Sequence, residues 1–389
     1  MRRLARTLAV LVLAAALWLP SVHVLLRPIA HAPASSGPPS PWAQQLSAAQ
    51  IALWTQPAQR AVEVARMRRA NAEWDFMGRT YLVLALANIA LREPAEKPRC
   101  LEIIDRIVAE TIRLDRENGV HFFLMPYSRA KPFLAVPPRS LFVDGEIALM
   151  IAARRVVEDG AEPRAQLPQY TRAALAQMQA GPVLSGESYP DECWTFCNTV
   201  ALAALRLEDF LDGTDRSAFF AEWVRTARAK LVEPKTGLLV SSYRHNGAWL
   251  DGPEGSSLWM SAHNLLVIDP DFARDQYSRA RRELGRSLLG FGYAREWPES
   301  HVGAIDIDSG PIVPLLEASP GSSGLALLGA GAFGDDAYYA SLAASLELGA
   351  FPARQGGTLR YRASNQVGDA VILYSAVQGP LWRRVGAPR

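Results

Sequence analysis

The sequence predicts an all-α protein, an (α/α)6 barrel in which paired helices surround a central cavity. The chain has 389 residues, 49% of them hydrophobic, which is enough for one large core. Apolar residues recur at helical spacing in about twelve segments. Turn residues and short β-like pieces separate these segments, so that helices follow one another in pairs. No strict sequence repeat is visible, and the barrel is inferred from this rhythm alone.

The first 41 residues are expected to be a targeting segment and a linker, and residues 42–389 the barrel domain. A basic head over residues 1–6 precedes an apolar run over 8–26, and Ala30-His31-Ala32 offers a cleavage site. A cleaved signal peptide fits the small residues of this site, whereas an uncleaved anchor fits an apolar run of about 19 residues. Both alternatives predict export. The body would be periplasmic, or anchored in the inner membrane and outside the cytoplasm, because the basic head stays inside.

The elements of the body are delimited by cap and turn residues such as Asp212-Gly213-Thr214-Asp215 and Asp269-Pro270. Many glycines and prolines interrupt residues 309–330, which argues against one straight helix there. Short strands are expected at 120–124, 238–243 and 358–361. Helices are expected near 46–69, 75–93, 98–116, 140–158, 168–179, 195–212, 215–231, 256–267, 270–289, 309–330, 334–348 and 366–383.

Charge and cysteine content exclude several classes of protein. The net charge is +2 and basic residues are scattered, so no nucleic-acid partner is expected. The three cysteines lack zinc-type spacing, so no metal is expected. Cys100 is expected to be a buried small hydrophobe. Cys193 and Cys197 are four residues apart, an awkward but not impossible spacing for a disulfide in an oxidising compartment.

The densest group of polar side chains lies at residues 187–199, directly before an apolar helical pattern. Burying such groups without partners would cost roughly 1–3 kcal/mol each, so a pocket suited to acid–base chemistry is expected. Alternatively, Asp191 complements a helix dipole and the Cys197 thiol is packing. The candidates for catalysis here are Tyr189, Asp191 and Cys197, and those for substrate binding are Glu187, Ser188 and Asn198.

Two further helix starts hold candidate catalytic carboxylates. Glu146 follows Asp144, which is expected to be an N-cap by residue type, and is followed by an unbroken apolar face. Desolvation there would raise its pKa and suit a general acid; the alternative is a first-turn acid at the helix dipole. Asp75 lies four residues before Arg79, so the two could form an oriented pair, although Asp75 also suits an N-cap.

Residues 243–308 supply the remaining candidates for substrate binding. Asp306 and Asp308 alternate with isoleucines, which on an extended segment places both carboxylates on one face; solvated loop acids are the alternative. No third acid follows at metal-loop spacing, which argues against calcium. Tyr243, Trp259 and His263 belong to an aromatic group, although a lone histidine is more often structural.

The run from Tyr189-Pro190-Asp191 through Phe196-Cys197-Asn198-Thr199-Val200-Ala201 resembles the signature of the linalool dehydratase/isomerase family. The similarity is strongest over 183–263 and extends over 75–310. It implies an exported, oligomeric (α/α)6 barrel without a cofactor. The family dehydrates a tertiary allylic terpene alcohol and isomerises the primary one, using cysteines, a histidine and an aspartate as acids and bases.

The resemblance assigns residues only in part. Cys197 corresponds to the second cysteine of the family, whereas Ser188 stands where the first is expected. Glu146 stands at the helix start that holds the family histidine, and Asp75 is the suggested counterpart of the aspartate. Fold and pocket position therefore carry over better than the activity itself.

These observations predict an enzyme without cofactor, a lyase or isomerase acting on a small alcohol in a partly apolar cavity. Glu146 would protonate the departing hydroxyl, and Cys197, Tyr189 or Asp191 would remove a proton or orient the substrate. A homo-oligomer is a further expectation, with membrane contact only through the N-terminal segment. The alternatives are a glycoside hydrolase with paired carboxylates, and a membrane-tethered binding protein without catalysis.

Overall fold

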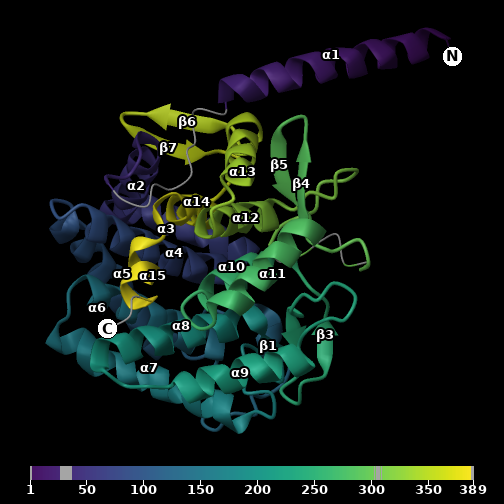
Figure 1. The fold of residues 1–389 in the computed structure, drawn as a ribbon. Coiled ribbons are helices and arrows are strands. Elements are labelled where there is room, and N and C mark those ends of the chain that lie inside the picture. Colours follow the sequence, from purple (N-terminus) through teal and green to yellow (C-terminus); the bar gives the residue numbers. More distant parts are fainter. Residues whose placement is uncertain (1, 27–36, 302, 304–306, 308, 387–389) are drawn as a thin grey trace.

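The computed structural model describes residues 2–26, 37–301, 303, 307 and 309–386. Six helices contact one another in chain order, and the last contacts the first, so they close a ring (Figure 1). The predicted (α/α)6 barrel is therefore confirmed. These inner helices are α4 (Ala72–Arg92), α6 (Leu141–Val157), α8 (Thr195–Asp212), α10 (Gly255–Leu265), α12 (Pro320–Phe333) and α14 (Gln366–Val377).

An outer layer of helices alternates with the inner ring along the chain. After each of the first five inner helices the chain returns through an outer helix: α5 (Lys97–Asn118), α7 (Ala161–Ala180), α9 (Ser217–Lys230), α11 (Pro270–Glu283) and α13 (Asp336–Gly349). The sixth outer place is filled by α2 (Pro41–Thr55), which contacts α14, and α3 (Pro57–Ala70), which contacts α4. The C-terminal α15 (Pro380–Gly386) contacts α4 and α8.

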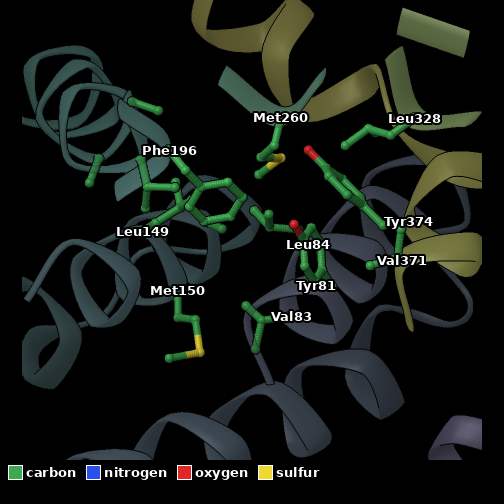
Figure 2. Packing of buried hydrophobic residues seen from close by; sticks show 14 of the residues in the cluster. Tyr81, Val83, Leu84, Leu149, Met150, Phe196, Met260, Leu328, Val371 and Tyr374 are labelled. Atoms are coloured by element: carbon green, nitrogen blue, oxygen red, sulfur yellow. The ribbon is translucent and has the colours of Figure 1, made fainter. Parts of the chain in front are cut away.

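The sequence explains which helices are inside. Helix α6 is buried on nearly every side, whereas the exposed and buried residues of α5 lie on separate faces, with Ile103, Ile104 and Ile107 inside. A helix that is apolar all round belongs in a core, and an amphipathic one on its surface. Gly145 lets α6 approach α8 closely, since a Cβ there would lie 3.3 Å from the Cβ of Ala201. Figure 2 shows side chains from all six inner helices meeting in this core.

Side-chain caps fix the starts of four inner helices. Asn71, Ser140, Ser319 and Asn365 each accept a hydrogen bond from a backbone N–H in the first turn of α4, α6, α12 and α14. Such caps satisfy N–H groups that have no partner within the helix. Because an outer helix returns the chain between successive inner helices, the capped ends lie together at one end of the barrel.

The short strands decorate that same end. Strands β1 (Cys193–Trp194), β2 (Ser242–Tyr243) and β3 (Trp249–Asp251) form an antiparallel sheet, with Cys193 opposite Tyr243 and Trp194 opposite Ser242. Two hairpins follow, β4 (Gly285–Leu288) with β5 (Phe291–Ala294), and β6 (Pro352–Gln355) with β7 (Thr358–Tyr361). All of them lie in segments that lead into an inner helix.

Several predicted boundaries were wrong, mostly at prolines. The helix expected over 46–69 is divided at Pro57, because a residue before proline is disfavoured in the helical conformation. The segment 309–330 becomes helical only from Pro320, and 366–383 is broken before Pro380. Residues 120–124 form turns rather than a strand. By contrast, the bounds 195–212 and the strand at 358–361 are confirmed.

The N-terminal helix α1 (Arg2–Leu26) stands apart from the barrel. It is long and apolar enough to cross a membrane, with a mean hydropathy of 2.2, and it buries none of that length in the protein. It touches the body at α13, and Figure 1 shows its N-terminus far from the barrel. Such a helix is compatible with a signal peptide or a membrane anchor.

Candidate active site

A cavity of about 1560 Å³ lies at the end of the barrel where the inner helices begin. Every inner helix contributes to its wall through residues of its first turns: Trp74, Phe142, Phe196, Ser257, Gly321 and Val367. Helix N-termini favour negative charge, and here they converge on one space. The cavity therefore combines apolar walls with helix N-termini, whose field favours carboxylates placed beside them.

Glu146 lies in the second turn of α6, one turn deeper than Phe142. It is 2% exposed, and its Oε2 has no hydrogen-bond partner among the described residues. Burial raises the pKa of Glu146 to about 8, and the nearby charge of Glu73 adds to the increase. The carboxyl is therefore mostly protonated at neutral pH, as a general acid must be before it acts.

Tyr81 of α4 and Cys197 of α8 are cavity-wall residues near Glu146, close enough for its charge to act on both. Both line the cavity, whereas Glu146 is not among the described lining residues. Burial raises the pKa values of the Tyr81 phenol and the Cys197 thiol well above their ordinary values, and the Glu146 charge contributes to both shifts. The Cys197 thiol also hydrogen-bonds the hydroxyl of Ser188. A protonated phenol and a protonated thiol thus line one corner of the cavity, and the buried Glu146 carboxyl lies near both of them.

A second acid, Glu73, borders the same corner. The hydroxyl of Tyr189 donates a hydrogen bond to Glu73 Oε1 and accepts one from the backbone N–H of Met125 at 2.9 Å. The ring of Tyr189 stacks on Tyr127 with centroids 4.6 Å apart. Burial and the charge of Glu73 raise the pKa of Tyr189 far above its ordinary value. Tyr189 is therefore a fixed hydrogen-bond donor, and its hydrogen bond orients the side chain of Glu73.

Sequence analysis passed over Glu73 in favour of Asp75, although helical spacing could have found it. Glu73, Met77 and Tyr81 recur every four residues on the face of α4 that lines the cavity. Asp75 and Arg79 lie on another face. Arg79 reaches Asp75 at 3.0 Å, and both side chains are almost fully buried. Asp75 is thereby held in a buried ion pair outside the cavity wall.

Glu192 and Glu296 also line the cavity; from the sequence, Glu192 was expected only to complement a helix dipole beside Asp191, and Glu296 was not a candidate. Trp194 Nε1 donates to Glu192 Oε1 at 2.6 Å, and burial raises the pKa of Glu192. Glu296 accepts a hydrogen bond from the backbone N–H of Ser256 at 3.0 Å and one from the Ser319 hydroxyl at 2.6 Å. It therefore joins the starts of α10 and α12, and this bonding marks Glu296 as a structural acid.

Three polar residues of the 187–199 segment are held in loop contacts. Glu187 accepts backbone N–H bonds at 2.9 Å from Leu134 and Ala135 and at 2.6 Å from Asp191, which ties two loops together. Asn198 accepts from the N–H of Gly186 at 2.9 Å. Asp191 itself faces outward, where it pairs with the guanidinium of Arg244 at 2.8 Å. These three shape the loops around the cavity without lining it.

The predicted aromatic group lies deeper in the core. Tyr243 hydrogen-bonds the Ser185 hydroxyl at 2.8 Å, and Trp259 Nε1 donates to Ser322 at 3.0 Å. His263 is fully buried, and its Nε2 lies 2.7 Å from the hydroxyl of Tyr374. Burial lowers the pKa of His263 to about 3, so its imidazole is neutral.

His263 is linked to the cavity corner through Tyr374, whose ring lies beside that of Tyr81 with centroids 6.3 Å apart (Figure 2).

Asp306 and Asp308 lie outside the described residues. Among the residues that the structure describes, Cys100, Cys193 and Cys197 are free and buried. Within the same residues, no group of three or more His, Cys, Asp or Glu side chains is placed to hold a metal.

Two comparisons with known proteins found matches to this chain. Among solved structures, a selenomethionine derivative of a GH76 α-mannanase from Bacteroides thetaiotaomicron aligns with 79% of this chain and 86% of its own, at 11% identity and a TM-score of 0.48. The sequence model of the linalool dehydratase/isomerase family matches residues 165–367, from α7 to the start of α14. This range contains Ser188 and Cys197, whereas Glu73 and Glu146 precede it. Since it spans more than half of the sequence, the chain belongs to the linalool dehydratase/isomerase family.

Proposed function

We propose that this protein is a lyase or isomerase that needs no cofactor and dehydrates or isomerises a terpenoid-like alcohol in the barrel cavity. The observation on which the proposal rests is the position of Glu146. Burial keeps its carboxyl protonated near neutral pH, directly behind two cavity-lining groups, Tyr81 and Cys197. Family membership supports the same class of reaction.

In the proposed dehydration, the substrate hydroxyl binds against Tyr81 and Cys197. Glu146 gives its proton to this hydroxyl, either directly or through the Tyr81 phenol, and the C–O bond breaks to release water. The allylic cation that remains is stabilised by the faces of cavity-lining aromatic rings such as Phe142 and Phe196. The electrons of the C–O bond leave with the oxygen, and Glu146 becomes a carboxylate.

Removal of a proton from the neighbouring carbon completes the reaction. Glu73, oriented by the hydrogen bond from Tyr189, is the proposed base. Proton transfer from Glu73 back to Glu146 restores the starting state, so that the net change is alcohol to alkene plus water. In the isomerisation, water instead adds to the other end of the allylic cation, and the proton that it loses returns to Glu146.

The proposal is tested with the purified full chain and a panel of tertiary and primary allylic terpene alcohols, followed by gas chromatography of the products. Glu146→Gln keeps the side-chain volume but removes the acid, so turnover should fall by about 10²–10⁴-fold. The exposed Glu102→Gln is the matched control and should behave as the parent protein. Unchanged turnover of Glu146→Gln on a substrate that the parent accepts would remove Glu146 from the mechanism.

A carbohydrate-active hydrolase is the second candidate, because Glu73, Glu192 and Glu296 give part of the cavity wall an acidic character. Aryl glycosides in the same panel separate the two candidates. Release of the aryl group, with no product from the terpene alcohols, would support the hydrolase and contradict the dehydratase. The body is proposed to lie outside the cytoplasm in either case, because the basic head of α1 precedes an apolar helix of membrane-spanning length.

A further inference from the structure

Large apolar side chains remain exposed along one side of the cavity mouth. Leu315 is fully exposed and Phe351 is 65% exposed. The others lie at the β4–β5 hairpin and in the segment before α12, and they also line the cavity. We call this set the apolar collar: Leu288, Leu289, Val313, Leu315, Leu316 and Phe351. Exposed apolar patches of this kind mark interaction sites on soluble proteins and membrane-facing sites on anchored ones.

Three residues of the collar also have an unusual backbone conformation. Leu289, Leu315 and Phe351 have φ values of 53°, 68° and 52°, in the left-handed region that favours glycine or asparagine. Leu289 and Gly290 form the two-residue turn of the β4–β5 hairpin, a place usually taken by Asn-Gly or Asp-Gly. Bulky apolar residues are disfavoured at these positions, both by the left-handed backbone conformation and by their exposure to water. Backbone outliers of this kind point to a function.

The last turns of α1 contact the β4–β5 hairpin, which carries the collar residues Leu288 and Leu289. Leu19 lines the cavity, and the ring of His23 packs edge-on against Phe291 with centroids 5.5 Å apart. His23 also lies against the hairpin turn, since a Cβ on Gly290 would come within 2.5 Å of its Nδ1. Figure 1 shows α1 above α13, on the side of the barrel where the β4–β5 hairpin projects.

The orientation of α1 places this contact at a membrane surface. Its apolar run begins after the basic residues Arg2, Arg3 and Arg6, which stay on the inner side of a membrane. If α1 spans the bilayer, His23 near its other end lies at the outer boundary of the hydrocarbon region. The hairpin that His23 touches, and the collar residues on it, would then be at the same depth, next to lipid rather than bulk water.

We propose that the apolar collar is a membrane-contact surface that seats the cavity mouth on the outer face of the lipid bilayer. A bilayer is favoured over a second copy of the chain because the collar is continuous with the end of the membrane-spanning helix. The cavity would then receive ligands that partition into the membrane, such as lipophilic alcohols. Only this statement about ligands rests on the proposed function; the membrane contact is independent of it.

The contact is tested by fluorescence quenching in the full chain reconstituted in vesicles of phosphatidylcholine and phosphatidylglycerol. The three native cysteines are buried, so an environment-sensitive label can be attached to Leu315→Cys alone. Phe351→Cys repeats the measurement at a second point of the collar. Ala218→Cys is the matched control, since it is exposed in α9 at the opposite end of the barrel.

Lipids brominated near the carbonyl end of their chains should quench the labels at Leu315→Cys and Phe351→Cys several-fold more strongly than the label at Ala218→Cys. Aqueous iodide should show the reverse order. Strong quenching of the collar labels by iodide would overturn the proposal, because the collar would then face water. Quenching by neither agent would also overturn it, because another protein surface would then cover the collar. Neither result depends on turnover, so a failure of the proposed function is recognised separately.

Discussion

Replacing Glu146 by glutamine should change how the stability of the protein depends on pH. The ordinary pKa of a glutamate is 4.5, and burial raises that of Glu146 to about 8 in the folded protein. Between these two values the folded state keeps a proton that the unfolded state has lost. Ionising Glu146 is therefore favourable only on unfolding, and the folded state loses stability as the pH rises through this window.

The size of the effect follows from the shift. One unit of pKa difference corresponds to about 1.4 kcal/mol, so the free energy of unfolding should fall by about that amount per pH unit because of this group alone. Below pH 4.5 both states are protonated and the effect vanishes. From pH 5.5 to 7.5 the Glu146→Gln variant should gain roughly 2–3 kcal/mol relative to the parent protein, because glutamine does not titrate.

Urea unfolding of both proteins at pH 5.5, 6.5 and 7.5 measures this difference directly. Other buried acids, such as Asp369 with its pKa raised to about 7, titrate in both proteins and cancel in the comparison. Glu102→Gln, on the exposed face of α5, should instead follow the parent curve at every pH. Parallel curves for Glu146→Gln and the parent would refute the argument, since Glu146 would then titrate alike in the folded and unfolded states.

Three further substitutions separate structural from catalytic groups. Asp75→Ala should lower the free energy of unfolding by about 1.5–3 kcal/mol, because it removes one carboxylate partner of the buried Arg79, which keeps Glu110 at 3.0 Å; a loss below 1 kcal/mol in urea unfolding would contradict this. Cys197→Ser should reduce turnover of terpene alcohols while the thermal midpoint changes little, and parental turnover would exclude the thiol from the reaction. Asp191→Asn should leave turnover nearly unchanged, because Asp191 pairs with Arg244 outside the cavity, and a large loss in kcat would reinstate it as a candidate.

The barrel could be predicted from sequence because its inner helices combine strong apolar content with caps and turns. The 195–212 helix was located at both ends, since Asp212-Gly213 stops it in the left-handed conformation that glycine favours. The break at Pro57 was missed because helical segments continue on both sides of it. Periodicity reports which faces are buried, but it does not report whether the axis of the helix changes direction.

The site was harder to predict than the fold, and α4 explains why. Glu73 and Asp75 are two residues apart, and both suit the first turn of a helix by composition. Their difference arises from the neighbours: Asp75 meets the buried Arg79, whereas Glu73 meets Tyr189, which is 116 positions away in the chain. Such a partner is fixed by how α4 and the loop before α8 pack, and the spacing of residues along the chain contains no direct signal for it.

The burial of Glu146 explains how a glutamate can stand where the family resemblance places a histidine. A histidine with its ordinary pKa of about 6.5 can donate a proton near neutral pH, and a solvated glutamate cannot. Burial removes this difference, because it raises the pKa of the carboxyl to about 8.

The two acids still differ in charge: a protonated glutamate is neutral, whereas a protonated histidine is a cation. A neutral acid is compatible with the closely packed phenol of Tyr81 and thiol of Cys197, whereas a buried imidazolium would need a counter-charge. After proton transfer, the carboxylate left on Glu146 would itself attract the allylic cation. In the proposed mechanism the glutamate would therefore supply the acid, and in its ionised state it would also stabilise the charge that its own proton transfer creates.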